Sequence, residues 1–189
     1  MSENYALQSL GVRLFVAAQL PDDVVSALSA WCPRVAGLRS VAPESLHLTL
    51  AFLGSRTEAE AAAAAAVVRT VAAPADGLSL GSARWLPAGR RPRVLAVSVE
   101  DPTGALGALR RSLVDGLGAA MGFEPDRRAF LAHVTVARVR SGTRVRGVAL
   151  DGVPDVGTFP ATALSLMRSH LSSSPRAPAR YEALETVAL

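Results

Sequence analysis

A four-residue pattern occurs twice in this chain, and the stretches that lead up to the two copies match as well. The copies are HLTL at residues 47–50 and HVTV at residues 133–136, so the second begins 86 positions after the first. Each follows a strand-like segment, a helix-like segment and an approach that contains a proline, Pro43 or Pro125. This parallel order indicates an old duplication. We therefore expect two related lobes, each carrying one copy of the pattern.

The rest of the chain mixes strand-like and helix-like segments. Apolar, β-branched runs predict strands, and apolar residues at helical spacing behind Pro, Asp or a capping box predict helices. The expected strands are 12–20, 46–54, 78–86, 93–99, 131–139, 162–170 and 181–187, and the expected helices are 21–36, 57–73 and 101–122. The stretch 141–159 has no clear pattern. Several connections are too short for a crossover helix, so we expect antiparallel sheets and the α+β fold class.

The composition excludes several classes of protein. The chain has 189 residues, half of them apolar, and we expect a single domain over 1–189 with a sizeable core. No stretch reaches the roughly 18 consecutive apolar residues of a membrane span, and the N-terminus lacks the pattern of a signal peptide. The single cysteine, Cys32, has no partner for an internal disulfide. These features predict a cytoplasmic protein with no membrane role and no obligate protein partner, acting as a monomer.

The charge pattern permits an anionic partner. The formal net charge is +4, and all 20 basic residues are arginine. Two groups of arginines are dense: residues 84, 90, 91 and 93, and residues 127, 128, 138, 140, 144 and 146. Such groups form either a solvated surface or a contact with an anion such as nucleic acid, and the sequence leaves both open.

The repeated pattern gains its meaning from strand geometry. Side chains on a strand alternate between faces, so His47 and Thr49 point one way while the leucines beside them point to the core. The same holds for His133 and Thr135. One such histidine is more often structural, but two in matched contexts favour a shared site. The third histidine, His170, has no threonine two positions later, and we expect it to be exposed or structural.

With these motifs the chain resembles the two-histidine (2H) phosphoesterase superfamily, and within it the RNA 2′,3′-cyclic phosphodiesterases, also called 2′-5′ RNA ligase-like proteins. The resemblance covers nearly the whole chain and rests on residues 13–17, 43–54, 90–95, 122–130, 167–169 and 179–181. Two positions depart from the family pattern: a tryptophan is usual near Ser40, and a proline is usual at Ala132. The resemblance implies two pseudo-symmetric lobes, with antiparallel sheets flanking a central cleft and helices outside.

The paired histidines suit the chemistry that this resemblance implies. Hydrolysis of a ribose 2′,3′-cyclic phosphate needs a base to activate water and an acid to protonate the departing ribose oxygen. Two imidazoles across a cleft supply both without a metal or another cofactor. We expect His133 to be the base and His47 the acid towards the 3′ oxygen, which gives a 2′-phosphate, although the sequence does not fix this order. Thr49 and Thr135 can donate hydrogen bonds to the non-bridging oxygens. The roles of the two histidines exchange in the reverse, ligating direction.

Four more residues enter through the resemblance. It implies that Arg138 contacts the phosphate, although strict alternation turns Arg138 to the other face unless the strand ends or bulges near Ala137. It places Phe15 near the substrate base, where stacking can operate, and a core phenylalanine is the alternative. Arg168 and Ser169 are expected to border the phosphate.

The expected substrates are RNA ends or nucleotides that carry a 2′,3′-cyclic phosphate, and other interpretations stay open. Small cyclic nucleotides, ADP-ribose cyclic phosphate or 2′-5′ oligonucleotides could use the same site. A non-catalytic RNA-binding module would use the arginine groups, and its RNA binding would depend on salt. His47 and His133 could instead be metal ligands, but two histidines without a nearby Cys or carboxylate are too few.

Overall fold

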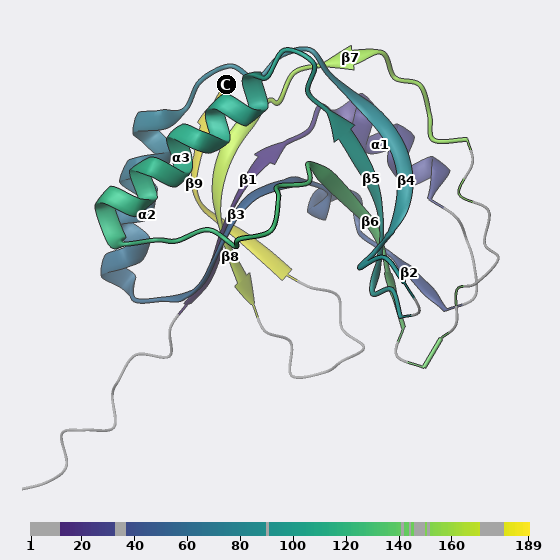
Figure 1. The fold of residues 1–189 in the computed structure, drawn as a ribbon, viewed down its shortest axis with the longest axis horizontal. Helices are drawn as coiled ribbons and strands as arrows, with labels where there is room; N and C mark the ends of the chain where they lie inside the picture. The colour runs from purple at the N-terminus through teal and green to yellow at the C-terminus, as the bar shows by residue number, and fades with distance from the viewer. Residues whose placement is uncertain are drawn as a thin grey trace, which may run out of the picture.

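The chain forms a curled antiparallel sheet with three α-helices (Figure 1). The structure is a computed structural model, and it describes residues 12–32, 37–89, 91–140, 142–143, 145, 150, 152–170 and 180–189. The elements in chain order are β1 (Val12–Gln19), α1 (Asp22–Trp31), β2 (Leu38–Ser40), the short 3₁₀ helix η1 (Pro43–Ser45), β3 (Leu48–Arg56), α2 (Glu58–Val71), β4 (Leu78–Leu86), β5 (Val94–Glu100), α3 (Ala105–Met121), β6 (His133–Val139), β7 (Thr158–Phe159), β8 (Ala163–His170) and β9 (Arg180–Ala188).

The sheet shows the expected duplication. Its strand order is β7-β4-β5-β6-β3-β1-β8-β9, with β2 paired to β6. The two central strands, β3 and β6, carry the two motifs, and each is flanked by the strand that opens its repeat, β1 or β5. The order β1-α1-β3 thus corresponds to β5-α3-β6. The two lobes share one continuous sheet, in which β3 pairs with β6 at Leu48↔Val134 and β2 of the first repeat pairs with the end of β6.

The main cluster of buried apolar residues lies on the face of the sheet that carries the helices. Leu48 and Leu50 of the first motif, and Val134 and Val136 of the second, belong to one apolar cluster. This cluster also contains residues of all three helices, for example Leu28, Val68 and Leu113. Because side chains alternate along each strand, the histidines and threonines of the motifs lie on the opposite face.

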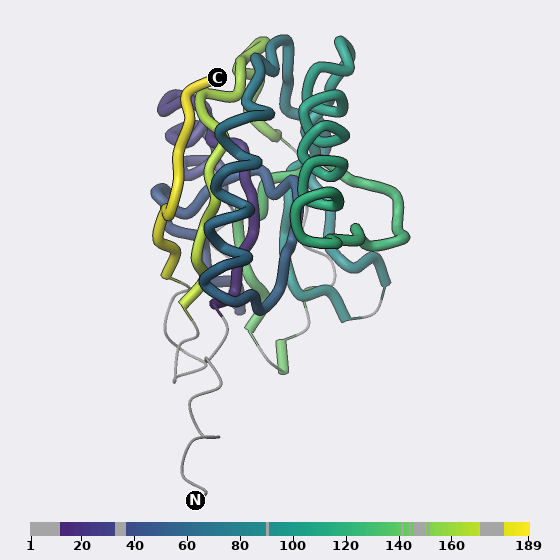
Figure 2. Tube along the Cα trace, turned by 90° about the vertical axis from the view of Figure 1, so that its left-hand side faces the viewer, coloured from purple at the N-terminus to yellow at the C-terminus, as the bar shows by residue number. Residues whose placement is uncertain are grey.

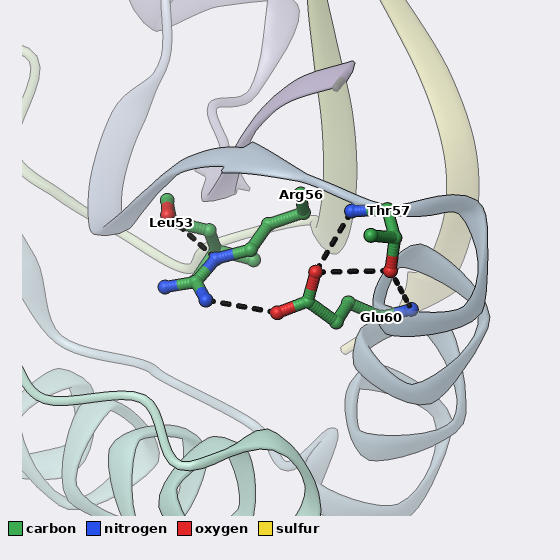
Figure 3. A network of polar contacts seen from close by, with 4 residues as sticks. All are labelled: Leu53, Arg56, Thr57 and Glu60. Atoms are coloured by element: carbon green, nitrogen blue, oxygen red, sulfur yellow. Dashed lines mark hydrogen bonds and ion pairs between the residues drawn. The ribbon is translucent and has the colours of Figure 1, made fainter. Parts of the chain in front are cut away.

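The second helix begins with the capping box that its sequence predicts. The Thr57 hydroxyl accepts a hydrogen bond from the Glu60 backbone N–H at 3.2 Å, and the Glu60 carboxylate accepts one from the Thr57 backbone N–H at 2.8 Å (Figure 3). The same carboxylate pairs with Arg56 at 3.0 Å, so the end of β3 is tied to the start of α2. Figures 1 and 2 show α2 and α3 side by side, and their contact is close at Gly116, where an added Cβ would lie 2.8 Å from Val67.

Several boundaries differ from the expected ones for local reasons. Helix α1 ends at Trp31 because Pro33 disfavours the helical conformation for Cys32, which has an extended ψ of 121°; residues 33–36 lie outside the described part of the chain. Helix α3 begins at Ala105 instead of Asp101, whose carboxylate accepts hydrogen bonds from the backbone N–H groups of Leu106 and Gly107. Sequence analysis did not find β2, η1 or β7, which are only two or three residues long.

Candidate active site

The two motif histidines lie at the starts of the two central strands. β3 begins at Leu48, directly after His47, and His133 is the first residue of β6, so both strands begin two residues later than expected. From the antiparallel pair Leu48↔Val134, one step in each direction sets His47 towards Thr135 and Thr49 towards His133. All four polar side chains are half-buried. The pairing of distant strands therefore brings both imidazoles and both hydroxyls to one place.

Each of the two imidazoles is held by an equivalent hydrogen bond to a backbone carbonyl. His47 Nδ1 lies 2.8 Å from the carbonyl oxygen of Ser45, and His133 Nδ1 lies 2.8 Å from the carbonyl oxygen of Leu131. A carbonyl oxygen only accepts hydrogen bonds, so Nδ1 must carry the proton in each ring. This fixes the tautomer and leaves Nε2 as the nitrogen for a substrate. Each histidine can therefore accept a proton when neutral and donate one when charged.

His47 is surrounded on two sides by aromatic rings. Phe15 stacks on it with ring centroids 4.9 Å apart, and Tyr181 meets it edge-on at 5.4 Å. Burial lowers the pKa of His47 to about 4; the hydrogen bond to Ser45 opposes this shift, while the positive charges of Arg138 and protonated His133 add to it. Without a bound anion, His47 is thus neutral at neutral pH.

Small residues flank each threonine. In the first lobe Ala17 pairs with Thr49, and in the second Ala96 pairs with Thr135. Both alanines are fully buried and lie outside the main apolar cluster. No hydrogen bond between described residues uses the hydroxyl of either threonine. The two lobes thus place an equivalent hydrogen-bond donor in each motif.

Each motif ends in a β-bulge. The β1–β3 register passes from Ala17↔Thr49 to Val16↔Ala51 and leaves Leu50 without a partner. The β5–β6 register passes from Ala96↔Thr135 to Leu95↔Ala137 and leaves Val136 without one in the same way. A bulge shifts the alternation by one residue. The residue five positions after each histidine therefore returns to the histidine face, and these two residues are Phe52 and Arg138.

Arg138 was expected to reach the histidine face only if the strand ended or bulged near Ala137. The bulge at Val136 meets this condition. The Arg138 guanidinium donates a hydrogen bond to the Tyr181 hydroxyl at 3.2 Å, and its charge acts on His47. Sequence analysis did not select Tyr181 as a site residue, although the segment 179–181 was part of the resemblance. Tyr181 lies in β9, and two strands, β1 and β8, separate β9 from β3 in the sheet. The curl of the sheet brings Tyr181 to His47.

The two phenylalanines of the first lobe differ in exposure. Phe15 is 3% exposed and contacts His47, Tyr181 and Phe52. Phe52 is 73% exposed, with its ring centroid 6.2 Å from that of Phe15. Phe15 is therefore buried against His47, whereas Phe52 presents its ring to solvent.

The structure does not bring Arg168 to the two motif histidines. Arg168 continues the alternation of Leu164 and Leu166, which belong to the apolar cluster, so it lies on the helix face. There it pairs with Glu58 at 3.2 Å and with Glu182 at 3.8 Å. The expectation that Arg168 borders the phosphate is not supported by this placement.

Two other residues of β8 lie near the edge of the site or outside it. Ser169 is on the histidine face, and its backbone pairs with that of Tyr181, which contacts His47. His170 is exposed, as expected, and its Nε2 lies 2.9 Å from a carboxylate oxygen of Glu182.

Within the described residues, no three or more His, Cys, Asp or Glu side chains gather where they could hold a metal ion. None of the helices in that part of the chain combines the length and apolar character needed to cross a bilayer.

Comparisons with known proteins agree with the fold and the motifs. The family model of the 2′-5′ RNA ligase superfamily matches residues 20–172. A relative from Escherichia coli (strain K12), named RNA 2′,3′-cyclic phosphodiesterase, is 30% identical over 182 residues, which cover 94% of this chain and 96% of the relative. A relative of the same name from Thermus thermophilus is 33% identical and covers 94% of this chain and 90% of its own length.

The fold is similar to solved structures as well. The crystal structure of E. coli LigT complexed with 3′-AMP superposes with a TM-score of 0.74 at 26% identity and covers 95% of this chain and 98% of that one. The family model spans far more than half of the chain, including both motifs. The chain therefore belongs to the 2′-5′ RNA ligase superfamily.

Proposed function

We propose that this protein hydrolyses the 2′,3′-cyclic phosphate of RNA ends or nucleotides to a 2′-phosphate. The observation that carries the proposal is the pair of imidazoles on adjacent central strands, each with Nδ1 held by a carbonyl and Nε2 left for a substrate. The names of the relatives support the same activity. Because each lobe supplies one histidine, we take the two lobes as one functional domain over residues 1–189.

The reaction uses one imidazole as base and the other as acid. The base takes a proton from water, the water oxygen forms a bond to phosphorus, and the bond from phosphorus to the 3′ oxygen breaks. The acid protonates that departing oxygen. No step needs a metal ion. In the reverse, ligating direction the two imidazoles exchange roles.

We assign the base to His133 and the acid to His47. Before substrate binds, His47 is neutral, since burial and the charge of Arg138 hold its pKa at about 4. An anionic phosphate beside Arg138 cancels that charge and attracts a proton, so substrate binding raises the pKa of His47. His47 thus takes up its catalytic proton as the substrate binds.

The remaining groups bind the phosphate and the base. Thr49 and Thr135 flank the phosphorus from both lobes and donate to its non-bridging oxygens, where negative charge grows in the transition state. Arg138 adds a positive charge on the same face. Phe15 packs under His47 and fixes its ring, and the exposed ring of Phe52 is the surface on which a base stacks.

Turnover of adenosine 2′,3′-cyclic phosphate in the presence of a chelator tests the proposal. His47→Ala and His133→Ala should each lower kcat by roughly 10²–10⁴-fold, because each variant lacks one proton-transfer group. The product of the wild type should be adenosine 2′-phosphate. His170→Ala is the matched control: this exposed histidine pairs with Glu182 outside the site, and its variant should keep the wild-type rate within about twofold.

Two outcomes would contradict this proposal. Wild-type rates in either motif variant would exclude acid–base catalysis by the pair. RNA binding that persists in both variants, with no turnover of the cyclic phosphate by the wild type, would indicate the RNA-binding module instead.

A further inference from the structure

An arginine on β4 lies in line with the threonine of the second motif. Arg84 of β4 is the ladder partner of Ala96 in β5, and Ala96 is the ladder partner of Thr135 in β6. Directly opposed residues on neighbouring strands point to the same face of a sheet. Arg84 therefore lies on the histidine face, in one row with Thr135, and only the short side chain of Ala96 stands between them.

The sheet curls towards this face. Tyr181 of β9 contacts His47 although two strands, β1 and β8, separate β9 from β3. Such a contact requires the histidine face to be the concave one. Side chains of the outer strands therefore converge above the central strands, and Arg84 shares this inner surface with the motif residues.

The guanidinium group of Arg84 leans towards the row of the sheet that contains His133. It donates a hydrogen bond to the hydroxyl of Ser82 at 3.2 Å. The backbone carbonyl of Ser82 accepts a hydrogen bond from Ser98 at 3.1 Å, and Ser98 is the ladder partner of His133. The positive charge thus lies next to both polar residues of the second motif.

This charge has no anionic partner in the described part of the chain. Arg84 is half-buried, and its Nε is a buried donor that meets no acceptor among those residues. Glu100, on the same face, is hydrogen-bonded to Ser98 at 3.4 Å and forms no ion pair with Arg84. A buried donor without an acceptor is unfavourable, and hydrogen bonds from a guanidinium to a phosphate are among the strong ones. A bound phosphate would supply the missing acceptor.

The first lobe has an uncharged residue at the equivalent place. Its row runs from Thr49 through Ala17 to Ser165, whose hydroxyl is hydrogen-bonded to that of Thr186 at 3.0 Å. The two rows agree in the threonine and the alanine and differ in the third residue. Of the two rows, it is therefore the one in the second lobe that adds a positive charge.

The other arginine of the proposed site, Arg138, lies in a different direction. It is three residues further along β6 than Thr135, and it lines a pocket beside His47 together with Arg39, Ser45 and Tyr181. Arg140, which follows β6, is exposed and does not line this pocket. Arg138 and Arg84 can thus approach one phosphate from two directions.

We propose that Arg84 binds the substrate phosphate from the β4 side, as a second arginine of the site. This inference rests on the proposed function, since it takes the phosphate to lie between the two motifs. The guanidinium donates to a non-bridging oxygen, where negative charge grows in the transition state. Arg84 thus recognises the phosphate and not the base or the ribose.

Turnover of adenosine 2′,3′-cyclic phosphate measures the contribution of Arg84. Arg84→Gln should lower kcat/KM by about tenfold, as expected for the loss of one charge-assisted hydrogen bond. Arg84→Lys keeps the charge and should give an intermediate value. Circular dichroism confirms that each variant is folded.

The matched control is Arg93→Gln. Arg93 directly precedes β5 and is exposed, and its alternation with Leu95 and Val97 of the apolar cluster places it on the helix face. This variant removes the same charge from the same pair of strands and should change kcat/KM by less than about twofold. Wild-type values in Arg84→Gln, or an equal loss in Arg93→Gln, would overturn the inference while the proposed function stands.

A binding measurement separates this inference from the proposed function. Calorimetric titrations with adenosine and with adenosine 2′-phosphate give the contribution of the phosphate without any turnover. Arg84→Gln should weaken the binding of adenosine 2′-phosphate by about tenfold and leave the Kd of adenosine unchanged, whereas an equal loss for both ligands would exclude a phosphate contact. If the wild type did not turn over the cyclic phosphate, the proposed function would fail, and these Kd values would still decide whether Arg84 binds phosphate.

Discussion

At the scale of single residues, the two motif histidines share a hydrogen bond but not an environment. Both rings are fixed through Nδ1 to the carbonyl two positions earlier. Only His47 is packed between Phe15 and Tyr181, and burial lowers its pKa to about 4. Equal motifs therefore place their histidines in unequal surroundings.

The pH dependence of the reaction follows from this difference. One proton on the pair of imidazoles supports the reaction and a second blocks it. As the pH falls through about 4, His47 takes up a proton before substrate binds, so kcat/KM should drop there. Arg138→Gln removes a positive charge that lowers the pKa of His47, so the acidic limb of its profile should lie at higher pH. Profiles of kcat/KM against pH for adenosine 2′,3′-cyclic phosphate measure the acidic limb of the wild type and of Arg138→Gln. Circular dichroism confirms that each protein stays folded.

Arg140→Gln serves as the control for this shift and should leave the limb in place. A wild-type limb near the ordinary histidine value of about 6.5, or an unmoved limb in Arg138→Gln, would contradict the environment described for His47.

At the scale of elements, two short-range devices prepare the site. The β-bulge after each threonine returns Phe52 and Arg138 to the histidine face, so equivalent positions present an aromatic ring in one lobe and a positive charge in the other. The capping box at Thr57 and Glu60 fixes the point where β3 passes into α2 (Figure 3). The bulges set which side chains face the substrate, and the capping box fixes the end of the strand that carries Phe52.

Removal of the Thr57 cap should cost measurable stability. Thr57→Ala leaves the Glu60 backbone N–H without its side-chain acceptor and should lower the free energy of unfolding by about 1 kcal/mol. Thr57→Ser keeps the hydroxyl and should change it by much less. Urea denaturation followed by circular dichroism measures both. Equal stability of the alanine variant and the wild type would show that the cap contributes nothing in this context.

At the scale of the whole molecule, the two lobes share one sheet and one apolar cluster. Their sheets join through Leu48 and Val134, and one apolar cluster includes residues of both repeats. The site depends on this continuity, because each lobe supplies one histidine and one threonine. The last strand, β9, completes the site, because its Tyr181 contacts both His47 and Arg138.

The lobes should therefore unfold together. Trp31 lies on α1 of the first repeat and Trp85 on β4 beside the second, and both pack against the shared cluster. Trp85→Phe leaves Trp31 as the only tryptophan, and Trp31→Phe leaves Trp85. Urea transitions followed by tryptophan fluorescence should coincide with those followed by circular dichroism in each variant. A fluorescence transition that precedes the other in one variant would show that the lobes unfold separately.

The sequence by itself determined the α+β class, seven of the strands, the three helices and the four polar residues of the motifs. It could do so because strand and helix periodicity, caps and the chemistry of histidine are properties of short segments. For Arg138 the sequence predicted only that the side chain reaches the histidine face if the strand ends or bulges, because one bulged residue reverses the face of every residue after it. Strand alternation places Arg168 on the same face as Leu164 and Leu166. Alternation alone did not say whether that face carries the helices or the motif histidines.

Only the tertiary structure decided which distant groups meet. Tyr181 at His47, Arg39 beside Arg138, the burial of Phe15 and the exposure of Phe52 all depend on strand order and register across the whole sheet. These relations join segments that are far apart in the chain, and no local pattern encodes them. The two short motifs thus supply the histidines and threonines of the proposed site, whereas the pKa of His47, the contacts of these side chains and the shape of the pocket come from the way the sheet curls around them.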